Sequence, residues 1–227
     1  SEATMIEIKN LNKIYLKGKK NMVHALNNIN LKIDDRETVA IIGESGAGKS
    51  TLLHIMSCID NFDGEYYLDN IDINKLSESK KSKLRSSKIG IVLQDFALID
   101  DFTVFENVMT PLYFNKKIKD KKGSVMRALK KTGIASLKAK KVSQLSGGQK
   151  QRVAISRALV TNPEYIFADE PTGSLDSKTS EEIVKMLFDL NRNGITIIIV
   201  THNLDIANKC QRVIEIKDGN IIEDNCS

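Results

Sequence analysis

"ETVAIIGESGAGKSTLLHIM", residues 37–56, is the stretch of sequence that decides the fold. An apolar run is followed by a glycine-rich turn and then by apolar residues at helical spacing, which predicts strand, loop and helix in that order. The turn GESGAGKS, residues 43–50, matches the pattern GxxxxGK[ST] in the strand-to-helix context that this pattern requires. The stretch therefore predicts a phosphate-binding loop.

The residue types of this loop suit a nucleoside triphosphate. Its glycines let backbone N–H groups turn toward phosphate oxygens, and the positive end of the following helix attracts the same anions. Lys49 would supply a point charge to the β and γ phosphates, while the hydroxyl of Ser50 can bind Mg²⁺. The expected ligands are therefore a triphosphate and Mg²⁺.

Two later segments, EYIFADEP (164–171) and ITIIIVTH (195–202), are short apolar runs that end in polar residues. Such runs are typical of strands buried on both faces of a parallel sheet. Between them, Thr179 and Glu182 have capping-box spacing and Gly194 stands where a helix is expected to end. The region predicts a strand, helix, strand unit.

The remaining pattern predicts two additions to this core. Residues 29–42 and 212–224 each place a polar turn between alternating strands, so each is predicted to form an antiparallel piece. Residues 95–160 have helical spacing and little strand signal, which favours an inserted helical lobe.

Polar residues at the ends of the predicted strands are candidates for catalysis. Asp169 could hold Mg²⁺, and the adjacent Glu170 is a candidate general base that would deprotonate a water molecule. Gln94 and His202 also follow apolar strands, at the sheet edge where ligands bind in open α/β folds. Each of the four has a structural alternative. The presence of a phosphate loop in the same chain favours the functional role of Asp169 and Glu170, and the position at the end of a sheet strand favours that of Gln94 and His202.

A second glycine-rich segment, QLSGGQKQRVAISRAL, covers residues 144–159. Ser146 can cap the following helix, and Gly147 and Gly148 expose backbone N–H groups, so the segment attracts anions. It has no lysine in the position of Lys49, and alone it would hold phosphate weakly. The residues alone leave three interpretations open: the segment is a redundant phosphate-binding turn, a second nucleotide site, or half of a site that another molecule completes.

Composition limits the class of protein. The chain has 227 residues, 41% of them hydrophobic, which is enough for one large domain or a core with an inserted lobe. The net charge of +5 is spread over a lysine-rich surface and predicts no nucleic-acid partner. Cys58, Cys210 and Cys226 form no CxxC pair, which favours a reducing cytosol over a disulfide framework or a zinc site.

The sequence places any membrane role in a partner. No apolar run approaches the roughly 18 residues that a membrane span needs, and no signal segment is recognised at the N-terminus. The predicted domain starts at Met5, so the four preceding residues are left out of it.

GESGAGKS, LSGGQKQR, YIFADE, Gln94, GSLD (173–176) and His202 resemble, in this order and spacing, the nucleotide-binding domains of the ATP-binding cassette (ABC) family. LSGGQ is the most specific of these motifs. The resemblance implies an α/β fold of the P-loop NTPase (RecA-like) type: a mostly parallel sheet flanked by helices, an antiparallel β subdomain and an inserted α-helical subdomain. It implies one ABC ATPase domain, 5–227, with core segments 5–94 and 160–227 and a helical signature subdomain, 95–159.

The resemblance also implies that two chains pair head to tail, each ATP lying between the phosphate loop of one chain and the LSGGQ segment of the other. The residues expected to contact ATP are Tyr15, Gly43, Glu44, Ser45, Gly46, Ala47, Gly48, Lys49, Ser50, Thr51, Gln94, Ser146, Gly147, Gly148, Gln149 and Asp176. Those expected at Mg²⁺ are Ser50, Gln94 and Asp169, and those expected to act in hydrolysis are Glu170, His202 and Lys49. Tyr15 resembles the adenine-stacking aromatic residue, with an ordinary core tyrosine as the alternative.

Within the family the sequence looks most like ATPases of the macrolide-exporter and lipoprotein-release group, which includes antimicrobial-peptide exporters. This likeness implies an ATP-hydrolysing subunit that drives a separate membrane permease, with mechanotransmission as one mode, from the inner face of the cell membrane. Relatives often have Leu-Pro after the loop that carries the residue corresponding to Gln94, whereas this chain has LIDDF (98–102), with Asp100 in place of the proline. This difference leaves the identity of the permease undetermined.

Three alternatives remain. The chain could be a cell-division ATPase, a non-transport ABC ATPase of DNA repair or translation, or a nucleotide-sensing module without turnover. The single cassette and the short interval between the two ATP motifs disfavour the second, and the presence of Glu170 and His202 disfavours the third.

Overall fold

The computed structural model describes residues 4–16, 18 and 20–226. The chain divides into two compact units: Ser1–Ser82 together with Thr196–Ser227, and Lys83–Ile195. The division falls within helix α2 (Glu78–Lys88). The domain boundaries predicted from the resemblance stay predictions.

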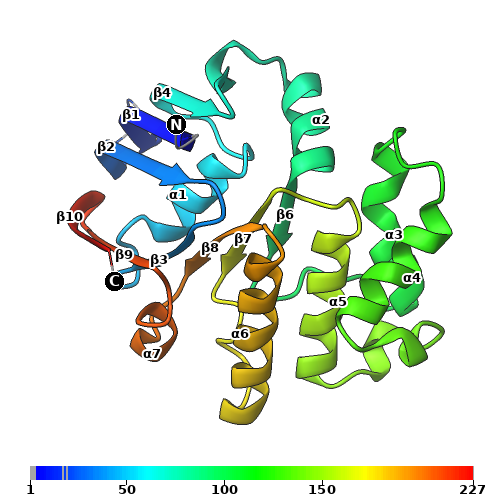
Figure 1. Cartoon of the computed structure of the whole chain (residues 1–227). Coiled ribbons are helices and arrows are strands. Elements are labelled where there is room, and N and C mark those ends of the chain that lie inside the picture. The colour runs from blue at the N-terminus through cyan, green and yellow to red at the C-terminus, as the bar shows by residue number, and fades with distance from the viewer. Residues whose placement is uncertain (1–3, 17, 19, 227) are drawn as a thin grey trace. The chain divides into compact units, whose positions relative to one another are not determined.

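The first unit contains an antiparallel sheet with strand order β2-β1-β4-β5 (Figure 1). Its elements are β1 (Thr4–Tyr15), β2 (Val23–Asp34), β4 (Asp63–Leu68), β5 (Ile71–Asp72) and the short helix η1 (Ile73–Lys75). Buried and exposed residues alternate along the second half of β2, as expected for a strand with one face on the core.

The first unit also contains parallel strands. Strand β3 pairs in parallel with β8 on one side and β9 on the other, and β9 continues antiparallel to β10. The bounds are β3 (Thr38–Ile42), β8 (Thr196–Val200), β9 (Arg212–Lys217), β10 (Asn220–Cys226), α1 (Lys49–Met56) and α7 (Leu204–Ala207). Every residue of β8 is buried, which the continuous apolar run predicted.

The predicted antiparallel piece at residues 29–42 is wrong. Its first half belongs to β2, which pairs with β1, and its second half is β3, which pairs with β8 and β9 in another sheet. The reason is burial: four of the five residues of β3 are buried, so this strand lies inside a parallel sheet and has no exposed face to alternate. The polar turn joins two sheets.

The second antiparallel piece, 212–224, is confirmed as the hairpin of β9 and β10. Asp218 and Gly219 lie between the strands with φ of 48° and 76°. Two successive positive φ values are what a tight two-residue hairpin turn needs, and the Asp-Gly pair adopts them at little cost.

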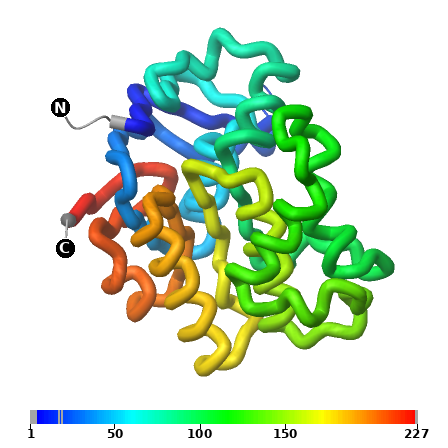
Figure 2. The backbone as a smooth tube through the Cα atoms, turned by 45° about the vertical axis from the view of Figure 1, so that its right-hand side comes forward, coloured from blue at the N-terminus to red at the C-terminus, as the bar shows by residue number. Residues whose placement is uncertain are grey.

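The second unit pairs β6 and β7 in parallel and contains most of the helices. Its elements are β6 (Ile89–Val92), α3 (Val104–Phe114), α4 (Lys121–Lys131), η2 (Ala135–Leu137), η3 (Val142–Gln144), α5 (Gly147–Leu159), β7 (Tyr165–Asp169) and α6 (Ser177–Arg192). Helices α3, α4 and α5 pack together (Figure 2), which confirms the helical character predicted for residues 95–160.

Helix α6 begins earlier than its predicted capping box. Its N-cap is Asp176, whose carboxylate accepts a hydrogen bond from the backbone N–H of Thr179 at 3.0 Å. Glu182 forms an ion pair with Arg152 at 2.8 Å and takes no part in a cap. The cap is Asp176, three residues before Thr179, because aspartate and threonine are both residue types that cap helices. The predicted end is confirmed by Gly194, at φ 95° just after C-cap Asn193.

Candidate nucleotide-binding and catalytic site

The phosphate loop connects β3 to α1 in the first unit. Lys49 is buried, and its Nζ donates hydrogen bonds to the carbonyl oxygens of Gly43 at 2.8 Å and Glu44 at 2.7 Å. The ammonium group therefore lies within the turn, which accounts for two of its three donors. The loop holds a concentrated positive charge beside a helix N-terminus.

Helix α1 starts without a side-chain cap. Its N-cap, Gly48, has φ 105°, and a Cβ there would lie 2.5 Å from the carbonyl oxygen of Ala25. Only glycine fits this position, both sterically and conformationally. No side chain of the cap residue occupies the first N–H groups of α1, so a bound anion can take them.

Tyr15 is not a core tyrosine, because its side chain is 37% exposed. Its hydroxyl donates to Asp60 at 2.8 Å, and Lys13 Nζ lies 4.8 Å from its ring centroid and 2.7 Å from the same carboxylate. The exposed ring is anchored at both its edge and its face. Its adenine-stacking role stays a prediction.

His202 lies at the same sheet edge as the phosphate loop. The register pairs Ile41 with Val200, and the N–H of Thr201 donates to the carbonyl of Ile41 at 3.1 Å. His202 follows directly and is exposed, before Asn203 caps α7. The first unit thus brings together the loop and His202 at the carboxyl ends of adjacent parallel strands, as expected for a ligand site.

In the second unit, Gln94 and Asp169 line the same cavity of about 500 Å³. Leu93, Asp95 and Ser174 complete its lining. The register of β6 and β7, which pairs Val92 with Ala168, explains the proximity because both polar residues follow the paired strand ends. Two of the three predicted Mg²⁺ ligands therefore share a cavity.

The donor set fits Mg²⁺ in part. An aspartate and an amide oxygen are oxygen ligands of the kind that Mg²⁺ takes, usually together with substrate phosphates and water. Among the described residues, no group of three or more His, Cys, Asp or Glu side chains could hold a metal. The protein groups alone would bind the ion weakly, and phosphate oxygens would have to complete the site.

Glu170 has an unusual backbone, with φ 45°. A non-glycine residue in this left-handed region is strained by about 1–2 kcal/mol and needs neighbours that hold it in place. The N–H of Gly173 donates to the carbonyl of Glu170 at 3.1 Å. Gln151, on α5, donates its amide to the carbonyl of Pro171, so both sides of the turn are held.

Gln151 was missed by the sequence reasoning. Its side chain is fully buried, and its Oε1 has no hydrogen-bond partner among the described residues. A buried polar side chain with one unsatisfied atom costs about 1–3 kcal/mol. The amide nitrogen must face Pro171, because the reverse orientation would place two acceptors against each other. No sequence signal reveals this contact, since it depends on how α5 packs.

The signature segment, residues 146–149, begins helix α5. Ser146 is the N-cap and forms a capping box: its hydroxyl accepts from the N–H of Gln149 at 3.3 Å, and Gln149 Oε1 accepts from the N–H of Ser146 at 3.1 Å. Ser146 and Gly147 are exposed. A Cβ at Gly148 would lie 2.4 Å from the methyl group of Thr179, so the segment packs closely on α6.

Asp176 turns its carboxylate toward its own helix. It accepts hydrogen bonds from the N–H of Thr179 at 3.0 Å and from the hydroxyl of Thr179 at 2.6 Å. These bonds lower the pKa of Asp176 from its ordinary value, with the side-chain bond as the largest cause. The group is therefore an anion at neutral pH, next to the signature segment through Thr179.

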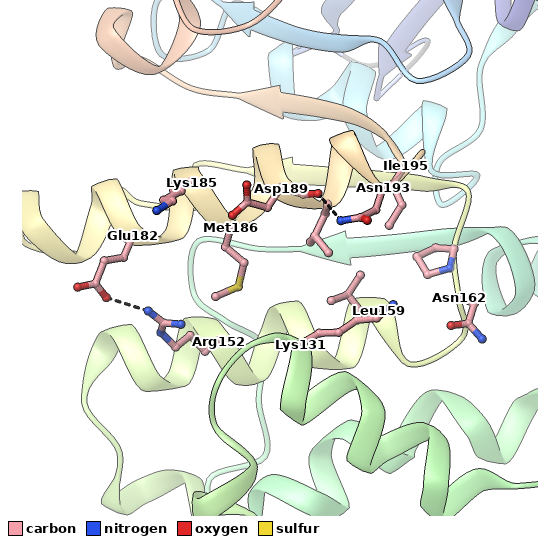
Figure 3. Close-up of a pocket in the computed structure, with 12 residues that line it drawn as sticks. Lys131, Arg152, Leu159, Asn162, Glu182, Lys185, Met186, Asp189, Asn193 and Ile195 are labelled. Atoms are coloured by element: carbon pink, nitrogen blue, oxygen red, sulfur yellow. Dashed lines mark hydrogen bonds and ion pairs between the residues drawn. The ribbon is translucent and has the colours of Figure 1, made fainter.

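A second cavity of the second unit, about 690 Å³, lies between α5 and α6 (Figure 3). Met186, Leu190 and Leu159 contribute apolar lining, and the ion pair of Arg152 and Glu182 crosses it. None of its lining residues is a predicted site residue. The cavity is separate from the chemistry assembled around Gln94 and Asp169.

Comparisons with known proteins agree with these motifs. The ABC transporter family profile matches residues 26–173. The chain is 44% identical over 222 residues to the uncharacterized ABC transporter ATP-binding protein YvrO of Bacillus subtilis, covering 97% of this chain and 96% of that protein. It is 45% identical over 222 residues to the macrolide export ATP-binding/permease protein MacB of Mannheimia succiniciproducens, covering 97% of this chain but only 34% of MacB.

Among solved structures, the chain is similar to MJ0796 of Methanocaldococcus jannaschii. That structure is described as a dimeric post-hydrolysis state of the ATP-binding cassette bound to ADP and Pi. The TM-score is 0.90 at 42% identity, covering 98% of each chain. This similarity confirms the predicted α/β fold of the P-loop NTPase type.

Proposed function

The chain belongs to the ABC transporter family and is an ATP-binding ATPase, and from this premise we propose that two copies close head to tail around two ATP molecules to drive a separate membrane permease. The observation that carries the proposal is the signature segment. Its helix end is exposed at Ser146 and Gly147, it attracts anions, and it has no lysine of its own. Such an end suits the completion of a site begun on another chain.

The site residues divide into binding and chemical tasks. Lys49, Ser50 and Thr51 hold the phosphates together with the backbone of residues 43–48, and Tyr15 stacks on the adenine. Across the dimer interface, the N–H groups of Gly147 and Gly148 face the γ-phosphate of the partner's ATP, with Ser146, Gln149 and Asp176 beside them. Closure is favoured because the triphosphate fills a gap between two positive helix ends.

Hydrolysis needs a base and charge stabilisation. Glu170 orients and deprotonates the attacking water, a task worth about 10² to 10⁴ in rate. His202 and Lys49 contact the γ-phosphate, where negative charge develops. Gln94, Asp169 and Ser50 would hold Mg²⁺, which neutralises phosphate charge when bound. The cavity that joins Gln94 and Asp169 supports this assignment.

The proposed permease is a separate protein. The likeness to YvrO supports this proposal, because the chain covers 96% of that protein, which is named as an ATP-binding protein. MacB, of which the chain covers 34%, is named as an ATP-binding/permease protein. None of the described helices is long and apolar enough to span a bilayer. Ile99, Phe102, Tyr113 and Phe114 expose large apolar side chains on the segment around α3, and these support a protein contact there. The chain would then act at the inner face of the membrane.

For the cargo, we propose export of the macrolide, antimicrobial-peptide or lipoprotein kind, in which the permease is moved mechanically. The similarity to a macrolide export protein supports this group. Asp100, which stands where relatives often have proline, forms a surface ion pair with Lys150 of α5 at 3.7 Å.

The test is Glu170→Gln, measured as ATP turnover and as dimer formation. Turnover should fall by at least about 100-fold because the general base is gone, while ATP still drives dimer formation on size-exclusion chromatography. Glu164→Gln is the matched control, since this exposed glutamate precedes β7 and forms a surface ion pair with Lys88 at 2.9 Å.

The wild-type rate per chain should also rise with protein concentration. Normal turnover in Glu170→Gln would remove Glu170 from its role. A rate per chain that does not depend on concentration, with a monomer throughout, would contradict the shared site.

A further inference from the structure

Two successive residues after Gln94 have left-handed backbones. Phe96 has φ 61° and Ala97 has φ 45°, and neither is a glycine. The N–H of Phe96 donates to the carbonyl of Leu93 at 3.1 Å, which closes a four-residue turn with Gln94 and Asp95 in its middle. Two adjacent strained residues persist only where their surroundings hold them, and such strain is concentrated at functional sites.

Arg157, in the last turn of α5, holds both strained residues. Its Nη2 donates to the carbonyl of Phe96 at 2.9 Å, and its Nη1 donates to the carbonyl of Ala97. The planar guanidinium offers two donors in a fixed geometry, which matches two neighbouring carbonyl groups. Burial lowers the pKa of the Arg157 guanidinium, and the charge of Asp95 opposes this shift. An arginine side chain is not deprotonated in proteins, so the donors stay available.

The position of this contact links two parts of the proposed site. The turn held by Arg157 carries Gln94, which lines the same cavity as Asp169. At its other end, the helix of Arg157 begins with the signature segment. A further contact joins the same segments, because Asp100 pairs with Lys150 in the first half of α5.

We propose that Arg157 is a positioning residue that fixes the turn of Gln94 to the signature helix and so keeps Gln94 at the cavity of Asp169. The inference rests on the proposed function, in which Gln94 serves Mg²⁺ and the signature segment serves the partner's ATP. Arg157 itself touches neither ligand. Its effect comes through the backbone of Phe96 and Ala97.

The test compares Arg157→Gln with Arg152→Gln. Arg152 lies on the same helix and donates to the carbonyl of Thr132 at 2.9 Å and to Glu182 at 2.8 Å, so its loss affects α4 and α6 and leaves the turn intact. The first measurement is backbone hydrogen exchange at residues 95–98 without nucleotide. The second is the Mg²⁺ concentration that gives half of the maximal ATPase rate.

Arg157→Gln should speed exchange at residues 95–98 and raise the half-maximal Mg²⁺ concentration by about 10-fold, the low end for residues that support a metal ligand. Arg152→Gln should change neither value. Wild-type exchange and Mg²⁺ dependence in Arg157→Gln, or equal changes in both variants, would overturn the proposal. If Arg157→Gln does not fold, Arg157→Lys is measured in the same way and read by the same criteria.

The exchange measurement also separates the two proposals. It needs no ATP, so it decides on the role of Arg157 even in a protein whose turnover does not depend on Mg²⁺. A wild-type chain without Mg²⁺-dependent turnover would contradict the proposed function alone.

Discussion

Helices α1 and α5 both begin at a glycine-rich turn, but their first turns are closed differently. Gly48 caps α1 without a side chain, and Lys49 follows directly inside the phosphate loop. Ser146 caps α5 with a complete capping box, and no lysine stands in the matching position. The first helix end is left open for an anion and the second is already partly satisfied.

This difference explains why one chain can have two glycine-rich anion-binding turns that are not redundant. An open helix end with an adjacent ammonium can bind a triphosphate alone, whereas a self-capped end with two glycines adds only weak attraction. The second turn becomes useful when another surface has already placed the phosphates. The comparison therefore supports a site shared between two chains.

Ser146→Arg should have the largest effect on this comparison. Arginine at the exposed cap would fill the space intended for the partner's ATP, and turnover should fall by more than about 100-fold, as for a reacting group displaced by about 1 Å. ATP affinity, measured with a fluorescent ATP analogue, should change little because Lys49 is untouched. Loss of both properties would show that the two turns are not separate.

Lys49→Ala should have the next largest effect. Removing an ammonium that bonds to phosphate should weaken ATP binding by about 10- to 100-fold, equivalent to the roughly 1.5–3 kcal/mol of a charged hydrogen bond. Lys150→Ala is the matched control, since this lysine lies on α5 and pairs with Asp100. Calorimetric titration with ATP would show unchanged affinity in the control. Equal losses in both variants would break the distinction between the helices.

Ser146→Ala should have the smallest effect. It removes the capping hydroxyl without adding bulk, so the free energy of unfolding should fall by about 1 kcal/mol in a denaturant titration. Turnover should stay much closer to wild type than in Ser146→Arg. A loss of turnover as large as that of the arginine variant would mean that the hydroxyl itself, and not the space around it, is required.

The sequence predicted those features of the fold and of the site that depend on local pattern. The phosphate loop, the capped signature helix and the hairpin at Asp218 and Gly219 each follow from neighbouring residues, and the structure contains all three. The error at residues 29–42 came from applying a local rule across a sheet boundary. The burial of four successive residues in β3 contradicts alternation, and the apolar run TVAII already indicated it.

Other features needed the tertiary structure. Gln151 reaches Pro171 and Arg157 reaches Phe96 and Ala97 only because α5 packs against these segments. A polar residue on a helix is equally compatible with an exposed position, so the burial of such a residue cannot be predicted from spacing. The same limit applies to Tyr15, because its hydrogen-bond partner Asp60 lies 45 residues further along the sequence.

The shared site is tested most directly by the mass of the protein in solution with ATP. In Glu170→Gln, where hydrolysis is blocked, light scattering should give twice the 25.3 kDa of one chain with ATP and one chain without it. Adding Ser146→Arg to this variant should return the mass to one chain while ATP stays bound. A dimer that persists in the double variant would contradict a site completed by the partner's signature segment.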